Sequence, residues 1–130
     1  MARGKRTHKV ASLAPSLPEA LEEYRYTCQC GYPGLSLDFR VQRGVVWLEG
    51  INVPDEYRGL GVGSTIVSGI CDLASQYGRE VLLLRRSDEG EEERLAAFYD
   101  ALGFEEVPPN ELDKYGLVAE EGFHYLRFGG

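Results

Sequence analysis

A glycine-rich stretch between two regular patterns places the strongest constraint on how this chain can fold. Residues 58–64 read Arg-Gly-Leu-Gly-Val-Gly-Ser. Before them, residues 45–53 are rich in β-branched and aromatic side chains, which predicts a strand. After them, apolar residues recur every three or four positions, as on one face of a helix; they are Val62, Ile66, Ile70, Leu73 and Tyr77. A helix that starts after such a turn presents unpaired amides to phosphate oxygens.

The spacing of the glycines distinguishes among the loops that can bind phosphate. A P-loop needs Gly-Lys before Ser or Thr, and here Ser64 follows Gly63 directly. A dinucleotide loop needs a glycine at the sixth position, and counting from Gly59 that position is also Ser64. The remaining pattern, Arg-x-x-Gly-x-Gly at Arg58, Gly61 and Gly63, resembles the acyl-CoA pyrophosphate loop of the GNAT N-acetyltransferase superfamily. The alternative is a turn that only connects two elements.

A second motif lies further along the chain. Residues 98–104 read Phe-Tyr-Asp-Ala-Leu-Gly-Phe, which resembles the Tyr-x-x-Leu-Gly-Phe pattern on the penultimate helix of the same superfamily. An aromatic residue on a helix usually belongs to a core, so this motif alone is weak evidence. Its position one strand beyond the glycine loop makes the resemblance stronger. Together the two motifs cover residues 45–107.

The resemblance implies a mixed α/β sheet in which an antiparallel N-terminal meander leads into two central parallel strands that splay apart, flanked by helices. Strand patterns at residues 24–29, 35–41 and 45–53 are consistent with the meander, and Arg43-Gly44 predicts a tight turn between the last two. The later elements are a buried strand, a helix and two further strands; they are expected at residues 81–84, 91–102, 104–107 and 123–128.

The domain boundaries follow from the start of the first helix. Residues 1–15 show no periodicity and are expected to form a basic, flexible arm. Residues 16–130 are expected to form a single GNAT-like domain. Its first helix is predicted over residues 16–23, because Ser16 is a suitable cap and Glu19 follows three positions later.

The resemblance implies that acetyl-CoA binds as the acyl donor and that no metal is needed. The backbone of three strand residues would pair with the pantetheine arm as an added strand, and the glycine loop would hold the pyrophosphate. The implied donor-binding residues are Ile51, Asn52, Val53, Arg58, Gly59, Leu60, Gly61, Val62, Gly63 and Ser64.

The catalytic candidates follow from the chemistry of thioester aminolysis, in which an amine loses a proton and a thiolate leaves. Tyr99 matches the family tyrosine that hydrogen-bonds and protonates the sulfur; otherwise it is a core aromatic. Glu49 is the candidate general base, because strand alternation places it on one face with Trp47, Ile51 and Val53, in an apolar setting that would raise its pKa. Otherwise Glu49 is a solvent-facing acid. His124 is the other candidate base.

Two features depart from the family pattern. The asparagine that often contacts CoA, seven residues before the helix tyrosine, is Glu92 here, so that contact is not carried over. The N-terminal part is also short, since only residues 16–23 could supply the helices that form the acceptor pocket in many members. We therefore expect an acceptor side that is open, completed by a partner subunit, or suited to a flexible protein lysine.

The charge distribution bears on the partners. The net charge is −7, and residues 1–10 carry four cations and no acid, which leaves −11 on the remainder. This acidic remainder of the chain favours a cationic amine as acceptor and makes nucleic acid an unlikely partner. Nucleic-acid binding through the basic arm is a third hypothesis for the function. No apolar run is long enough to cross a membrane, and a secretory signal is not expected, since the first residues lack an apolar segment.

The three cysteines, Cys28, Cys30 and Cys71, fit a reducing compartment and lack the spacing of a zinc site, so a cytoplasmic location is expected. The sequence thus predicts an N-acetyltransferase that moves acetyl from acetyl-CoA to a primary amine, either of a small molecule or of a protein lysine or N-terminus. The alternative is a catalytically inactive CoA-binding or sensing module. A homodimer through exposed sheet edges is compatible with both.

Overall fold

A five-stranded mixed sheet organises the computed structural model, which describes residues 15–86 and 92–129. The strand order is β1-β2-β3-β5-β4, with β2 and β3 parallel and the other neighbours antiparallel. The strands are β1 (Ser36–Gln42), β2 (Val45–Asn52), β3 (Val81–Arg86), β4 (Glu105–Glu106) and β5 (Phe123–Phe128). The predicted mixed sheet with a parallel central pair is confirmed. Residues 1–14 of the expected arm (residues 1–15) and the acidic residue Glu91 lie outside the described residues.

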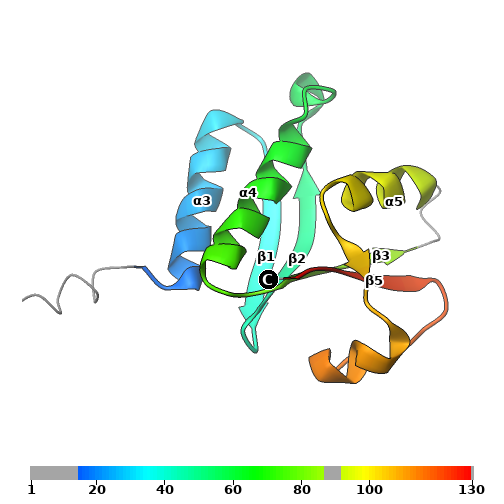
Figure 1. Ribbon diagram of the computed structural model, residues 1–130. Helices are drawn as coiled ribbons and strands as arrows, with labels where there is room; N and C mark the ends of the chain where they lie inside the picture. The colour runs from blue at the N-terminus through cyan, green and yellow to red at the C-terminus, as the bar shows by residue number, and fades with distance from the viewer. Residues whose placement is uncertain (1–14, 87–91, 130) are drawn as a thin grey trace, which may run out of the picture.

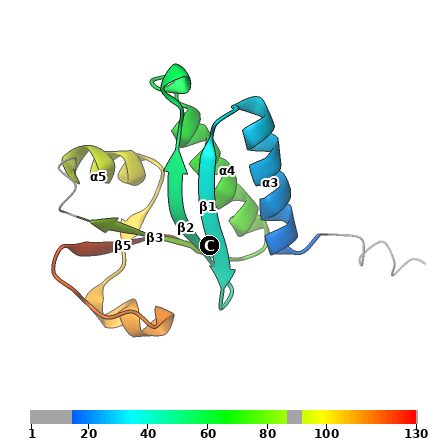
Figure 2. The same cartoon turned by 180° about the vertical axis from the view of Figure 1, so that it is seen from behind.

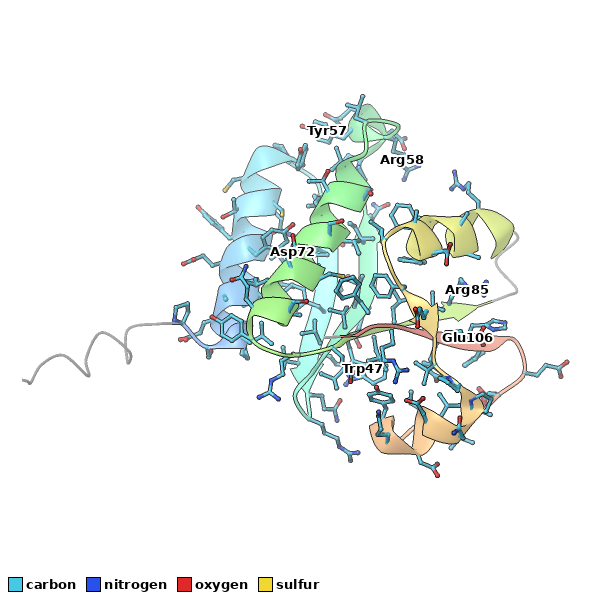
Figure 3. The ribbon with its side chains drawn as sticks, in the orientation of Figure 1. Trp47, Tyr57, Arg58, Asp72, Arg85 and Glu106 are labelled. Atoms are coloured by element: carbon cyan, nitrogen blue, oxygen red, sulfur yellow. The ribbon has the colours of Figure 1, made fainter. Side chains whose placement is uncertain are left out.

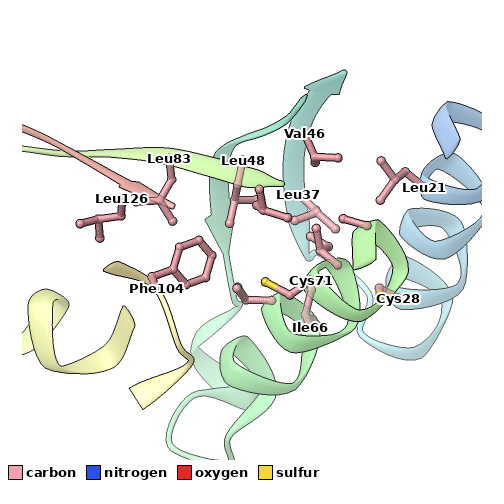
Figure 4. Packing of buried hydrophobic residues seen from close by; sticks show 14 of the residues in the cluster. Leu21, Cys28, Leu37, Val46, Leu48, Ile66, Cys71, Leu83, Phe104 and Leu126 are labelled. Carbon is pink, nitrogen blue, oxygen red and sulfur yellow. The ribbon is translucent and has the colours of Figure 1, made fainter. Parts of the chain in front are cut away.

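The α-helices lie on one face of this sheet, and among the described residues the far face of β1 and β2 carries no α-helix (Figures 1 and 2). On one face lie α3 (Leu17–Gly31), α4 (Val62–Gln76) and α5 (Glu92–Ala101), whose apolar side chains share the larger core with the strands (Figure 4). On the other face the 3-10 helix η2 (Pro109–Tyr115) packs Leu112 against Leu82 in a smaller core. The short 3-10 helix η1 (Asp55–Tyr57) follows β2. None of the described helices is long and apolar enough to span a membrane.

The predicted strand at residues 24–29 is wrong, because α3 continues through it to Gly31. The capping box that Ser16 and Glu19 form is present, as predicted. Residues that pack in the core recur at spacings of four, three and four along α3, which is the period of one helix face, and they continue beyond residue 23. These residues are Leu17, Leu21, Tyr24 and Cys28. The alternation of apolar and polar residues at 24–28 is misleading, because Tyr26 is 69% exposed. The expected meander is therefore a single hairpin.

The central parallel pair separates after two residue pairs. Val46 is in register with Val81 and Trp47 with Leu82, and the described residues of β2 and β3 form no further pair. Beyond this point β2 turns away from β3 in both views (Figures 1 and 2). The predicted splay of the central strands is confirmed.

A β-bulge on the other side of β2 accounts for this separation. In the ladder with β1, Asp38 faces Gly50 and Phe39 faces Leu48, so Glu49 is an extra residue in β2. A bulge bends its strand and increases the local twist. The end of β2 therefore leaves the plane that it shares with β3.

The packing of α3 on α4 depends on Gly69. The Tyr24 hydroxyl donates a hydrogen bond of 2.9 Å to the carbonyl oxygen of Ile66, and a Cβ at Gly69 would lie 2.0 Å from that hydroxyl oxygen. We expect Gly69→Ala to lower the free energy of unfolding by about 1–3 kcal/mol through overpacking, although alanine favours helix. Urea denaturation measures this. Gly31→Ala is the control, since no atom lies within 4 Å of a Cβ there; a Gly69→Ala protein as stable as that control would contradict the prediction.

Candidate active site

The glycine loop joins the end of β2 to the start of α4. Gly59 and Gly61 have φ values of 79° and 76°, in the left-handed region that favours glycine. A Cβ at either position would meet no atom within 4 Å, so the backbone conformation, rather than lack of space, requires these two glycines. The loop therefore turns sharply enough to direct the start of α4 toward the gap between β2 and β3.

The first turn of α4 is suited to bind an anion. Its N-cap is Gly61, and no side chain of the described residues caps the helix. The first turn contains no acidic residue. The amides that follow Gly61 in this turn belong to Val62, Gly63 and Ser64, and the N-terminal end of the helix dipole adds partial positive charge. These features match the needs of phosphate oxygens.

Arg58 lies across the base of this loop (Figure 3). Its Nε donates to the Val53 carbonyl oxygen at 2.9 Å and its Nη2 to Oδ1 of Asn52 at 3.3 Å. Its Nη1 lies 3.0 Å from Oδ1 of Asp55, but Asp55 is 91% exposed, so that ion pair is weak. The guanidinium is thus positioned by the backbone and remains exposed to solvent.

The fold brings both sequence motifs to one cavity of about 430 Å³. We call it the donor cavity; the predicted site residues that line it are Ile51, Val53, Arg58, Gly59, Gly61, Val62, Gly63, Ser64 and Tyr99. Of the other predicted donor-binding residues, Asn52 holds Arg58 instead, and Leu60 is 72% exposed. Tyr57, Arg94 and Phe98 also line the cavity and were not predicted from the sequence.

Tyr99 is held in the donor cavity by aromatic neighbours. Its ring meets those of Phe98 and Phe104 edge-on, with centroids 5.0 and 5.6 Å away. Such contacts restrict the ring and help position its hydroxyl group. The residue is half-buried, so both readings of Tyr99 hold in part, because it packs on the core and also lines the cavity.

Glu49 lies on the opposite side of the sheet from the donor cavity. The prediction that it shares a face with Ile51 and Val53 is wrong, because the bulge shifts the alternation of side chains by one residue. Its Oε2 lies 2.7 Å from Nε of Arg40, and its side chain is 48% exposed. Arg40 in turn lies over the ring of Trp47, at 5.1 Å from the centroid.

A second cavity, of about 810 Å³, occupies this opposite face and is called the outer pocket. Leu48, Glu49 and Leu84 place it beside the separation of β2 and β3. Trp47, Tyr115 and Tyr125 supply aromatic walls. The two cavities therefore approach the same gap in the sheet from opposite faces.

The wall that η2 contributes to the outer pocket is held by a polar network. Nη1 of Arg127 donates to Oε1 of Glu111 at 2.7 Å and to the hydroxyl oxygen of Tyr115 at 2.9 Å. The Tyr115 hydroxyl donates to Oε1 of Glu80 at 2.9 Å. The hydrogen bond from Arg127 holds the pKa of Glu111 below its ordinary value, and the same bond raises that of Arg127. The outer pocket is thus walled by η2, a segment for which the sequence predicted neither a helix nor a strand.

His124, the other candidate base, lies away from both cavities. Its Nδ1 is 3.1 Å from Oε2 of Glu106, and it belongs to the described lining of neither the donor cavity nor the outer pocket. The side chain of Glu92, the departure from the family pattern, lies outside the described residues. The part of the chain that the structure describes contains no cluster of His, Cys, Asp or Glu that could hold a metal.

Comparisons with known proteins agree with this geometry. Residues 21–104 match the model of the acetyltransferase (GNAT) family. Thialysine N-epsilon-acetyltransferase from Bos taurus is 32% identical over 104 residues, which cover 79% of this chain and 54% of the relative. The chain thus spans about half the length of this curated relative. It belongs to the GNAT acetyltransferase family.

Solved structures share the fold. An acetyltransferase from Streptococcus agalactiae has a TM-score of 0.56 at 16% identity, over 92% of this chain and 82% of that one. A Bacillus subtilis acetyltransferase in complex with CoA has a TM-score of 0.53 at 17% identity, over 74% of this chain and 68% of that one. At such identities the match supports the architecture rather than a particular activity.

The Arg127 network predicts a pH dependence of stability. Because the pKa of Glu111 is lowered in the folded state, its contribution is present above the unfolded value of 4.5 and is lost as pH falls through the lowered folded value. We expect Glu111→Gln to lose less thermal stability than the wild type between about pH 5 and pH 3. Melting temperatures across this range test it, with exposed Glu121→Gln as control. A Glu111→Gln profile parallel to that of the wild type would refute the role of this ion pair.

Proposed function

We propose that this protein transfers the acetyl group of acetyl-CoA to a primary amine. The observation that carries the proposal is that two cavities, one on each face of the sheet, are lined by residues of β2 beside its separation from β3. The donor cavity contains the glycine loop and Tyr99, and the outer pocket contains Glu49. Two substrates can therefore approach a common point from opposite faces, as a direct transfer requires.

The residues of the donor cavity fit a CoA thioester. The amides at the start of α4, together with Arg58, would bind the pyrophosphate. Beyond Trp47, the β3 side of β2 has no partner strand among the described residues. Ile51, Asn52 and Val53 therefore offer backbone groups with which an amide-containing pantetheine arm can pair.

Tyr99 and Glu49 would act from the two sides of the gap. As the amine nitrogen attacks the acetyl carbonyl carbon, a backbone N–H of residues 51–53 would donate to the oxyanion. As the C–S bond breaks, the Tyr99 hydroxyl would give its proton to the sulfur. The carboxylate of Glu49, next to the gap in the outer pocket, would take the proton that the amine loses, through a water molecule.

The acceptor is proposed to be an amine on a small molecule or a protein. The name of the Bos taurus relative refers to an ε-amine, which supports a side-chain amine as acceptor. Self-association along the β1 edge and a cytoplasmic location belong to the same proposal. The free cysteines Cys28, Cys30 and Cys71 are consistent with a reducing compartment.

Charge reversal at the loop tests the donor site. We expect Arg58→Glu to weaken acetyl-CoA binding about tenfold to a hundredfold, because one charge-assisted contact to phosphate is lost and a repulsive charge is added. Calorimetric titration measures this affinity. Arg79→Glu, beyond the C-terminal end of α4, is the control with the same change of charge. Equal affinities of the two variants would remove Arg58 from the donor site.

Removal of one hydroxyl tests the proposed acid. We expect Tyr99→Phe to reduce kcat about a hundredfold while the Kd for acetyl-CoA changes little, because proton transfer to the thiolate is lost and the ring remains. Tyr77→Phe is the control, since its hydroxyl donates to the Pro15 carbonyl oxygen, away from both cavities. A normal kcat in Tyr99→Phe would make Tyr99 a packing residue. A wild type that binds acetyl-CoA and acetylates no amine would be a CoA-binding module.

A further inference from the structure

The charge of the outer pocket differs from that of the protein as a whole. The net charge of −7 favours a cationic acceptor at long range. The pocket itself is lined by three cations and two acids; the cations are Arg40, Arg43 and Lys114, and the acids are Glu49 and Glu80. At the distances that act within a pocket, these side chains outweigh the remote surface, because exposed charges are screened over about 8 Å at physiological salt.

Most of these charges are already paired. Arg40 pairs with Glu49 at 2.7 Å, and Lys114 lies 3.4 Å from Glu111. Glu80 accepts the Tyr115 hydroxyl and lies 3.9 Å from Nε of Arg127. Within residues 15–86 and 92–129, Arg43 has neither an ion pair nor a hydrogen bond from its side chain, so it is the surplus cation of the pocket.

The backbone of Arg43 gives independent evidence. Its φ is 55°, and it is the one non-glycine residue with positive φ in the part of the chain that the structure describes. Gly44 follows with φ 74°, as in the two-residue turns that prefer Asn-Gly. Arginine is disfavoured at such a position by its Cβ. The turn between Gln42 and Val45 sets this φ, so a bulky cation occupies a position that asparagine would adopt with less strain, and that position borders the pocket.

The position of Arg43 defines the length of that ligand. Along β2, Val45, Trp47 and Glu49 line the outer pocket in a row, and four residues of strand extend about 13 Å. Glu49 marks the gap, and Arg43 lies beyond Val45 at the hairpin turn, with its guanidinium against Gly116 at the end of η2. Trp47 lies between Val45 and Glu49 along β2 and forms an apolar wall of the pocket.

We propose that the outer pocket takes a small acceptor in which an extended apolar stem joins the primary amine to a carboxylate, and that Arg43 binds the carboxylate. The inference rests on the proposed function, because the amine end must reach the gap near Glu49. The stem would lie along Trp47, and Arg43 would form charge-assisted hydrogen bonds with the carboxylate.

Acetylation of matched amines tests this assignment. The probes are 10-aminodecanoate, decylamine and 1,10-diaminodecane, which share the amine and a stem long enough to follow the row from Glu49 to Val45, and which differ at the far end. We expect kcat/KM for 10-aminodecanoate to exceed that for the other two at least tenfold, mainly through a lower KM. Equal use of decylamine, or a preference for the diamine, would overturn the proposal.

The variant Arg43→Asn separates function from folding. Asparagine tolerates the left-handed backbone better than arginine, so we expect an unchanged or higher melting temperature. The preference for 10-aminodecanoate over decylamine should fall to about onefold, because the cation is gone. Arg79→Ala is the control, since Arg79 packs against Gly44 of the same turn without lining the pocket. A preference retained in Arg43→Asn would refute the role of Arg43.

Direct binding distinguishes failure of this inference from failure of the proposed function. If no amine is acetylated, the transferase proposal fails, and calorimetric titration with 10-aminodecanoate still tests the carboxylate site. Binding to the wild type that is lost in Arg43→Asn would uphold the site. Absence of binding to the wild type would reject it. Acetylation of decylamine without any preference would uphold the transferase and reject the carboxylate site.

Discussion

The bulge at Glu49 in β2 is the constraint on which the rest of the site depends. Because it adds one residue to β2 and none to β1, β2 bends away from β3 after Trp47. The last residues of β2 then lack a partner on that side. The extra residue also shifts the alternation of side chains, which directs Ile51 and Val53 to the donor cavity and Glu49 to the outer pocket. One irregularity thus opens the sheet and divides its side chains between two cavities.

Local electrostatics act against the overall charge at both cavities. The protein carries −7, yet the first turn of α4 has no acidic residue and directs its amides at the donor cavity. In the outer pocket, ion pairs neutralise the acids and leave Arg43 in surplus. Short-range hydrogen bonds and pairing, rather than net charge, therefore decide which anions each cavity can hold.

Sequence reasoning predicted some parts well and failed at others for identifiable reasons. The glycine loop, α4, the hairpin turn and the last strand were predicted, since glycine positions and apolar periods are local properties. The strand at residues 24–29 was wrong, because a short alternating run also fits a helix whose face is shared by Leu17, Leu21 and Tyr24. The face of Glu49 was wrong, because a bulge has no signal in the residues around it.

The sequence by itself determined the class of protein and the donor loop, because the spacing of Arg58, Gly61 and Gly63 within one short segment is enough to recognise the motif. Tertiary structure alone decided that Tyr99 shares a cavity with that loop, that Glu49 faces away from it, and that η2 walls the outer pocket. The sequence likewise does not show that Arg43 is the cation left over in the outer pocket, since this depends on which acidic residues already form ion pairs with other cations. The physical reason is that the spacing of a motif is a property of one short segment. Which charges form ion pairs, and which face of the sheet a side chain lies on, depend on contacts between segments that are distant in the sequence.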